Sequence, residues 1–203
     1  MKIICIGRNY ADHAKELNND LPSEPVFFIK PDTCSSRNGQ AFYLPDFSNE
    51  IHHEVELVIK ICRVGKNIER RFAHKYYQEV SVGIDFTARD IQEEQKKKGL
   101  PWEKAKAFDG SAPIGNFIPK SALENLNNIN FKLIINDKLA QQGNSNQMIF
   151  DFDTIIEYVS KFITLKIGDL IYTGTPAGVG KINIGDQLEC FIEDQKLLHF
   201  KVK

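Results

Sequence analysis

Apolar and polar residues alternate along much of the chain, and a period of two predicts β-strands. The clearest example is Ile51–Cys62, IHHEVELVIKIC, where one face carries Ile51, Val55, Leu57, Ile59 and Ile61 and the other carries Glu54 and Glu56. Shorter runs predict further strands at Lys2–Ile6, Val26–Lys30, Tyr76–Asp85, Phe131–Asn136, Lys138–Leu139, Leu170–Thr173, Gln187–Ile192 and Leu197–Val202. Asn136–Asp137 is predicted to be the turn of a hairpin.

Three segments are predicted to be helices. Asn9 is expected to cap Tyr10–Leu17, and Thr87 or Asp85 to cap Ala88–Lys98, which Gly99 and Pro101 end. Asp153 is expected to cap a third helix, whose apolar stripe we assign to the core: Ile155, Ile156, Val159, Phe162 and Ile163.

The helix at Ala88–Lys98 has little apolar surface beyond Ile91. Weak burial favours movement, so this helix is a candidate lid that would carry Arg89, Asp90 and Gln92 over a site. An ordinary surface helix is the alternative.

Composition narrows the class of protein. The chain has 203 residues, 42% of them hydrophobic, and a formal charge of -1, which fits one large domain and gives no basic surface for nucleic acid or an anionic membrane. Its four cysteines form no C-x-x-C pair, and the apolar start MKIICIG is short for a signal peptide. We therefore expect a soluble, cytoplasmic protein.

Glu54 and Glu56 lie on the same face of their predicted strand, with Cα atoms roughly 6.6 Å apart. Both carboxylates can reach one cation, and oxygen ligands of this kind suit Mg²⁺, Mn²⁺ or Ca²⁺ better than zinc. The alternative is an acidic pair on a solvated face. Asp85 follows a nearby strand, in the loop before a helix, which is a common place for a ligand or catalytic side chain.

Other side chains are candidates for chemistry. His13 and Glu16 lie three residues apart on one helical face, where a carboxylate orients an imidazole as a general base; an exposed ion pair is the alternative. Lys104 and Lys106 are expected to face away from the anchors Trp102 and Phe108, and Lys30 faces either a site or the solvent.

The glycine-rich stretch Thr173–Gly180, TGTPAGVG, lets backbone approach a ligand closely. Its N–H groups and the Thr175 hydroxyl suit a carboxylate. The spacing matches neither a Walker A loop nor a dinucleotide fingerprint. A glycine-rich turn without function is the alternative.

Five blocks in this order, GRNYADHAKE, HHEVEL, DFTARDIQ, KGLPWEKAKAFDG and TGTPAGVG, resemble the fumarylacetoacetate hydrolase family, most closely its small acylpyruvase and oxaloacetate-acting branch. The likeness runs from about Gly7 to the C-terminus. The chain looks like the stand-alone catalytic domain, over residues 1–203.

The resemblance implies a mainly β (α+β) fold, a mixed β-sandwich roll with short peripheral helices, usually in homodimers. It implies a Mg²⁺ or Mn²⁺ site on Glu54, Glu56 and Asp85. It assigns the catalytic roles to His13, Glu16 and Lys106, and contacts with a substrate carboxylate to Arg89, Gln92 and Thr175. His52 and His53 are not ligands in this pattern.

The implied substrate is a small 2-oxo acid, whose carboxylate and keto oxygen would chelate the cation while it stabilises an enolate. Our leading expectation is a hydrolase of C–C bonds or a decarboxylase. A keto–enol tautomerase or isomerase of oxaloacetate-like or 2-hydroxy-dienedioate substrates is the alternative, followed by a metal-binding domain without catalysis.

Overall fold

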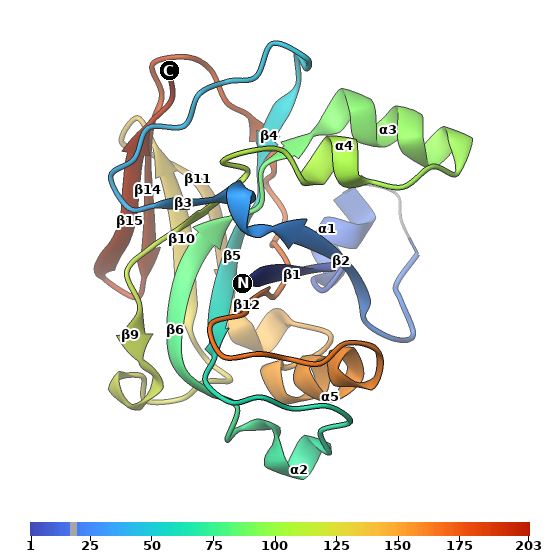
Figure 1. Cartoon of the computed structure of the whole chain (residues 1–203). Helices are drawn as coiled ribbons and strands as arrows, with labels where there is room; N and C mark the ends of the chain where they lie inside the picture. The colour runs from blue at the N-terminus through green and yellow to red at the C-terminus, as the bar shows by residue number, and fades with distance from the viewer. Residues whose placement is uncertain (17–19) are drawn as a thin grey trace.

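The computed structural model describes residues 1–16 and 20–203, and in these residues the strands form three sheets (Figure 1). The largest follows the order β2 (Val26–Pro31), β1 (Lys2–Gly7), β12 (Leu170–Tyr172), β5 (Val55–Ile61), β6 (Tyr77–Ile84), β8 (Ala112–Ile114) and β3 (Ser35–Arg37), with β9 (Ile118–Pro119) also on β6. The second is β11 (Lys138–Asn144), β10 (Asn130–Ile135), β14 (Gln187–Ile192) and β15 (Gln195–Lys201), and the third is β13 (Gly180–Lys181), β4 (Ile51–His53) and β7 (Thr87–Ala88).

The helices are short and lie around the sheets (Figure 1). They are α1 (Ala11–Glu16), α2 (Arg70–Ala73), α3 (Arg89–Lys98), α4 (Glu103–Lys106) and α5 (Phe152–Phe162), with 3-10 turns at Asp32–Cys34, Lys120–Ala122 and Ser145–Gln147. The expected end of the first helix, at Leu17, lies outside the described residues. Among the helices described, none has the length and apolar character needed to cross a membrane.

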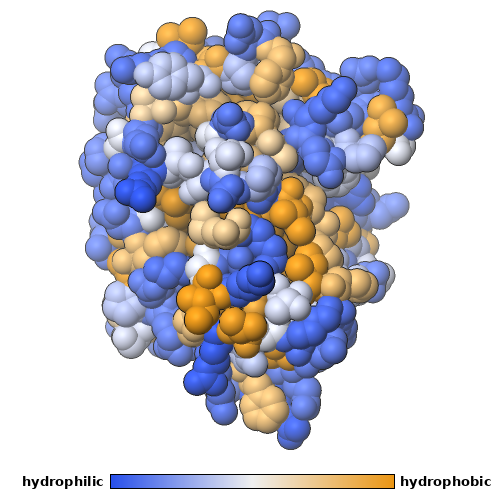
Figure 2. Space-filling model, in the orientation of Figure 1, coloured by the Kyte–Doolittle hydropathy of each residue, from blue (hydrophilic) through white to orange (hydrophobic). Residues whose placement is uncertain are grey.

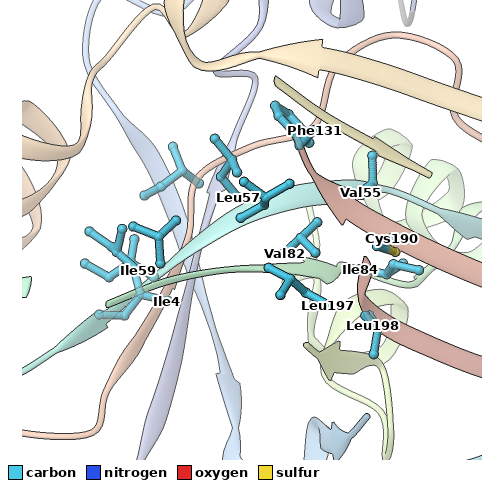
Figure 3. Packing of buried hydrophobic residues seen from close by; sticks show 14 of the residues in the cluster. Ile4, Val55, Leu57, Ile59, Val82, Ile84, Phe131, Cys190, Leu197 and Leu198 are labelled. Atoms are coloured by element: carbon cyan, nitrogen blue, oxygen red, sulfur yellow. The ribbon is translucent and has the colours of Figure 1, made fainter. Parts of the chain in front are cut away.

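The core lies between β5 and β6 of the large sheet and the four-stranded sheet (Figure 3). Alternate residues of β5, among them Val55 and Leu57, point toward this interior together with Val82 and Ile84 of β6. Phe131 and the strands of the second sheet close it from the other side. Each such fully buried side chain contributes about 1.5–3 kcal/mol relative to exposure. The expected mainly β fold is confirmed.

The surface of the molecule, unlike its core, is mainly hydrophilic on the face shown (Figure 2). On the face drawn in Figure 2, hydrophilic side chains cover most of the molecule and hydrophobic ones form separate patches. Most apolar side chains of the predicted strands therefore point into the interior of the molecule.

The predicted strand Ile51–Cys62 is divided at Glu54, which corrects that prediction. β4 pairs with β7 and β13, whereas β5 pairs with β6 and β12. At the break, the carbonyl oxygen of Glu54 accepts a hydrogen bond from the backbone N–H of Asp85 at 2.8 Å. The chain thus changes sheets where the first acidic residue lies, and this brings Glu54 beside the end of β6.

Three predicted helix caps are wrong. Thr154 N–H is capped by the Asp151 carboxylate at 2.8 Å, so α5 begins earlier than the Asp153 prediction. α3 follows Ala88 without a side-chain cap, because Thr87 and Asp85 bind Lys106 instead.

The side chain of Asn9, just before α1, is fully buried and bonds to remote segments instead of capping the helix. Its amide donates to the carbonyl oxygens of Thr173 and Phe150 at 2.8 and 3.0 Å, and its Oδ1 accepts from Phe150 N–H at 2.8 Å. Asn9 therefore joins distant segments of the chain.

The apolar stripe of α5 is confirmed at Ile155, Ile156 and Val159, which are fully buried. Phe162 is wrong as a core residue, since it is 59% exposed and lies at the surface against the rings of Phe27 and Tyr158. α5 extends past the edge of the core, so Phe162 in its last turn is exposed to solvent.

Candidate active site

Glu54, Glu56 and Asp85 converge on one buried point. Glu54 lies at the break between β4 and β5, Glu56 is the second residue of β5, and Asp85 follows β6. One oxygen from each carboxylate lies within 4.8 Å of the others. The three residues are 5%, 1% and 2% exposed, so the alternative of a solvated acidic face is wrong.

Three cationic side chains surround these carboxylates. Lys106 Nζ donates to Glu54 Oε2 at 2.8 Å and to Asp85 Oδ2 at 2.7 Å, and Lys30 Nζ lies 2.6 Å from Asp85 Oδ1. Arg89 forms an ion pair with Glu54. When all three carboxylates are ionised, three negative and three positive charges therefore balance within the site.

The cluster alters its own acid–base behaviour. Burial opposes ionisation of Glu54, but the charges of Lys106 and Arg89 outweigh burial and hold the pKa of Glu54 well below its usual value. Burial likewise disfavours the charged form of Lys106, but the Asp85 and Glu54 carboxylates hold its pKa above the usual value. Glu54 and Lys106 are thus both charged at neutral pH.

Glu56 differs from the other two acids. Within the described residues no cationic side chain lies within salt-bridge distance of it, and its Oε2 accepts a hydrogen bond from Gly174 N–H at 2.7 Å. Burial and the neighbouring Asp85 charge raise its pKa well above the usual value. A buried carboxylate that lacks a cation, beside two others, fits a divalent metal ion with hard oxygen ligands.

His13 and Glu16 form the expected pair. His13 Nδ1 lies 3.2 Å from Glu16 Oε2, and Glu16 Oε1 also accepts from Gly178 N–H at 3.1 Å. His13 is only 6% exposed and lines the same pocket as the carboxylates. An exposed helical ion pair is therefore wrong for His13, whereas its partner Glu16 lies at the surface.

The TGTPAGVG stretch follows β12 and differs in detail from its expected role. Gly174 and Gly178 have φ angles of +101° and +99°, which favour glycine. Their N–H groups hold carboxylates of the protein, Glu56 and Glu16, rather than a ligand. Thr175 remains as the side chain of this stretch that lines the pocket.

A single pocket brings together eight of the nine side chains named from the sequence. Glu16 is the ninth and contacts the pocket through His13. The eight are His13, Glu54, Glu56, Asp85, Arg89, Gln92, Lys106 and Thr175.

The sequence was compared with models of known protein families. A profile of the family described as Fumarylacetoacetate (FAA) hydrolase C-terminal matches residues 2–203. The chain belongs to the fumarylacetoacetate hydrolase family.

Two relatives of this fumarylacetoacetate hydrolase family member are named as enzymes that act on oxaloacetate. The mitochondrial oxaloacetate tautomerase of Mus musculus is 45% identical, over 99% of this chain and 91% of the relative. The mitochondrial oxaloacetate decarboxylase of Dictyostelium discoideum is also 45% identical, over 94% of this chain and 88% of the relative.

A solved relative is the fumarylpyruvate hydrolase from Pseudomonas aeruginosa in complex with Mn²⁺ and pyruvate. It has a TM-score of 0.94 and 34% identity, over 100% of this chain and 89% of that chain. The β-sandwich roll expected from the resemblance is confirmed by this match.

In this family member Lys104 and Lys106, the two candidate lysines of the segment 100–110, differ in burial. Lys104 is exposed, whereas Lys106 is 3% exposed and points into the site. Because the two lie in one short helix, α4, their alternation in sequence did not show which would be buried. Lys30, left open by the sequence, is fully buried beside Asp85.

Several pocket residues had no sequence signal. Arg8 lines the pocket with a left-handed φ of 59°, and Lys96, Phe28 and Trp102 complete the wall. Arg8 and Trp102 lie between regular elements and follow no period, whereas Phe28 in β2 and Lys96 in α3 face segments that are remote in sequence.

α3 places Arg89 and Gln92 in the pocket, where Arg89 donates to Gln92 Oε1 at 2.6 Å. Asp90 points elsewhere, accepting hydrogen bonds from Ser48 Oγ at 2.6 Å and Asn49 N–H at 3.1 Å. Movement of α3 as a lid stays a prediction.

Proposed function

We propose that this enzyme uses Mg²⁺ or Mn²⁺ to interconvert the keto and enol forms of oxaloacetate or a closely similar 2-oxo dicarboxylic acid. The observation that carries the proposal is the meeting of Glu54, Glu56 and Asp85 with His13 in one pocket. The name of the Mus musculus relative supports the same reaction.

Charge supports a dianionic substrate. The three carboxylates and three cations balance, so a divalent ion would leave the buried site with two positive charges. A 2-oxo dicarboxylate supplies two negative charges, which lowers the cost of burying the ion. Arg8 and Lys96 also line the pocket and would favour a second carboxylate.

The bound ion would supply a Lewis acid that withdraws negative charge from the keto oxygen. Arg89, Gln92 and Thr175 would hold the substrate carboxylate, and Lys106 would keep Glu54 and Asp85 in place. His13, oriented by Glu16, would take the proton from C3. Return of a proton to the oxygen gives the enol and its return to C3 gives the keto form, so atoms and charge balance.

Cleavage of a C–C bond is the second candidate, and the names of the Dictyostelium discoideum and Pseudomonas aeruginosa relatives favour it. Loss of CO₂ from oxaloacetate would break the C3–C4 bond and leave the enolate of pyruvate, which takes up a proton at C3 to give pyruvate. For an acylpyruvate, His13 would instead deprotonate a water that attacks the distal carbonyl. A metal-binding domain without catalysis is disfavoured, because it has no use for a buried base, its orienting carboxylate and Lys106.

Product analysis separates the two candidates. Purified protein with Mg²⁺ or Mn²⁺ is mixed with enol oxaloacetate, and loss of the enol absorbance is followed beside pyruvate release in a coupled assay. We expect rapid loss of the enol without matching pyruvate. Stoichiometric pyruvate would favour decarboxylation, and pyruvate from acetylpyruvate would favour hydrolysis.

Replacing His13 separates proton transfer from metal binding. His13→Ala is expected to lower kcat by about 10²–10⁴-fold, the usual contribution of a general base, while Mn²⁺ affinity measured by calorimetry stays close to that of the parent. His199→Ala, at an exposed position of β15, is the control. Full activity of His13→Ala would remove the base from the mechanism.

We also propose that the protein is a homodimer, as family members usually are, and that it is located in the cytoplasm.

A further inference from the structure

Gln141 is a buried amide outside the set of site residues considered so far. It belongs to β11, at the edge of the four-stranded sheet, and is 2% exposed. Its side chain reaches across to the break between β4 and β5 and to the Thr173–Gly180 stretch. It therefore connects the two segments that carry Glu54 and Thr175.

Four polar contacts satisfy this amide. Its Oε1 accepts from Val55 N–H at 3.0 Å and lies 2.8 Å from His53 Nδ1. Its Nε2 donates to the Pro176 carbonyl oxygen at 2.9 Å and to Thr175 Oγ1 at 3.0 Å. A backbone N–H only donates and a carbonyl only accepts, so Val55 and Pro176 fix which end of the amide is oxygen.

This orientation sets the direction of the Thr175 hydroxyl. Because Thr175 Oγ1 accepts a hydrogen from Gln141, its own hydrogen is free to be donated elsewhere. Within the described part of the chain, the acceptor assigned to it is Pro176 O at 3.5 Å, beyond the usual range for an O–H donor. Thr175 lines the pocket, so an anion there is a better acceptor.

Glycines make room for this arrangement. A Cβ atom at Gly178 would lie 3.0 Å from Ala140 O and 3.4 Å from Gln141 Cγ. A Cβ atom at Gly180, which pairs with His53 across the strands, would lie 3.2 Å from His53 Nε2. The last two glycines of TGTPAGVG thus allow the loop to lie close to the Gln141 network.

We propose that Gln141 is a positioning residue that presents the Thr175 hydroxyl as a hydrogen-bond donor to the substrate carboxylate. It acts through Thr175 and holds the loop against the Glu54 break. The inference rests on the proposed function, because it requires a carboxylate ligand in the pocket.

Oxalate is a suitable probe, since it reproduces the carboxylate end of a 2-oxo acid. Calorimetric titration of the Mn²⁺-loaded protein with oxalate is compared for the parent, Gln141→Met, Thr175→Val and the double variant. Each single substitution is expected to weaken oxalate binding about 10-fold or more, as for loss of a hydrogen bond to a charged group. Gln142→Met, at the exposed neighbouring position, is expected to leave oxalate binding unchanged.

The double variant gives the decisive comparison. If Gln141 acts through Thr175, Gln141→Met weakens oxalate binding by less than about 2-fold once Thr175 is already valine. Multiplication of the two single effects would show a merely structural role and overturn the proposal.

Two substitutions of Thr175, to serine and to valine, keep the test independent of whether Gln141→Met folds. Thr175→Ser retains the donor and should bind oxalate like the parent, whereas unchanged binding by Thr175→Val would overturn the inference. If the Mn²⁺-loaded parent itself fails to bind oxalate, the proposed function fails and Thr175 has no carboxylate to contact. Failure at Gln141 alone leaves the proposed function standing.

Discussion

Glu56→Gln is expected to lower divalent-metal affinity by more than about 100-fold and to abolish turnover, because loss of a ligand should exceed the 10–100-fold loss typical of a residue behind the ligands. Glutamine keeps the shape and one oxygen but lacks the negative charge. Mn²⁺ titration followed by calorimetry measures the first effect, and loss of enol oxaloacetate measures the second.

The fold should survive this change. Glu56 is buried beside two other carboxylates and lacks a cationic partner in the described part of the chain, so removing its charge relieves repulsion. The Tm of metal-free Glu56→Gln should equal or exceed that of the parent. Glu124→Gln, at an exposed position, serves as a control for loss of one negative charge. Parent-like Mn²⁺ affinity in Glu56→Gln would contradict the metal assignment.

Lys106→Met is expected to destabilise the metal-free protein by about 3–5 kcal/mol, the usual cost of removing one partner from a buried ion pair. Lys106 is within hydrogen-bond distance of Glu54, Asp85 and Thr87 at 2.8, 2.7 and 2.6 Å, so its loss leaves two carboxylates with less compensation. Denaturant unfolding without metal measures the change, and turnover should fall in the same variant.

Binding of a divalent metal ion should restore part of the stability that Lys106→Met loses. A divalent ion replaces positive charge beside the same carboxylates, so Mn²⁺ should raise the Tm of Lys106→Met by more than it raises that of the parent. Lys104→Met, on the exposed side of the same helix, should match the parent in stability and turnover. A Lys106→Met protein as stable as the Lys104→Met protein would show that the buried pairs contribute little.

The sequence predicted most strands because their residues either largely alternate between apolar and polar, as in β14, or form a short apolar run, as in β1. β6, β10 and β14 match their predicted ranges to within one residue. Glu54 shows where this logic fails: the alternation continues through it, yet the chain changes sheets there. Pairing partners decide such a break, and they are remote in sequence.

The site was predicted as a set of residues, but its burial was not. Glu54 and Glu56 look like a solvated pair in a strand because alternation alone cannot show that α1, α3, α4 and the Thr173–Gly180 stretch surround that face. Lys30 and Gln141 illustrate the remainder. Their partners lie 55 residues from Lys30 at Asp85 and 34 residues from Gln141 at Thr175, so no local pattern reveals their role.

The parallel pairing of β1 with β12 has a consequence for biosynthesis. Ile3 lies opposite Leu170, so β1 cannot gain this neighbour until the chain has been synthesised beyond Leu170 and that segment has left the ribosome. Pairing across such a sequence separation gives a high contact order, which slows folding. His13 and Thr175 come to line one pocket only after that step, and nascent chains that stop before Leu170 should have neither a complete central sheet nor an assembled pocket.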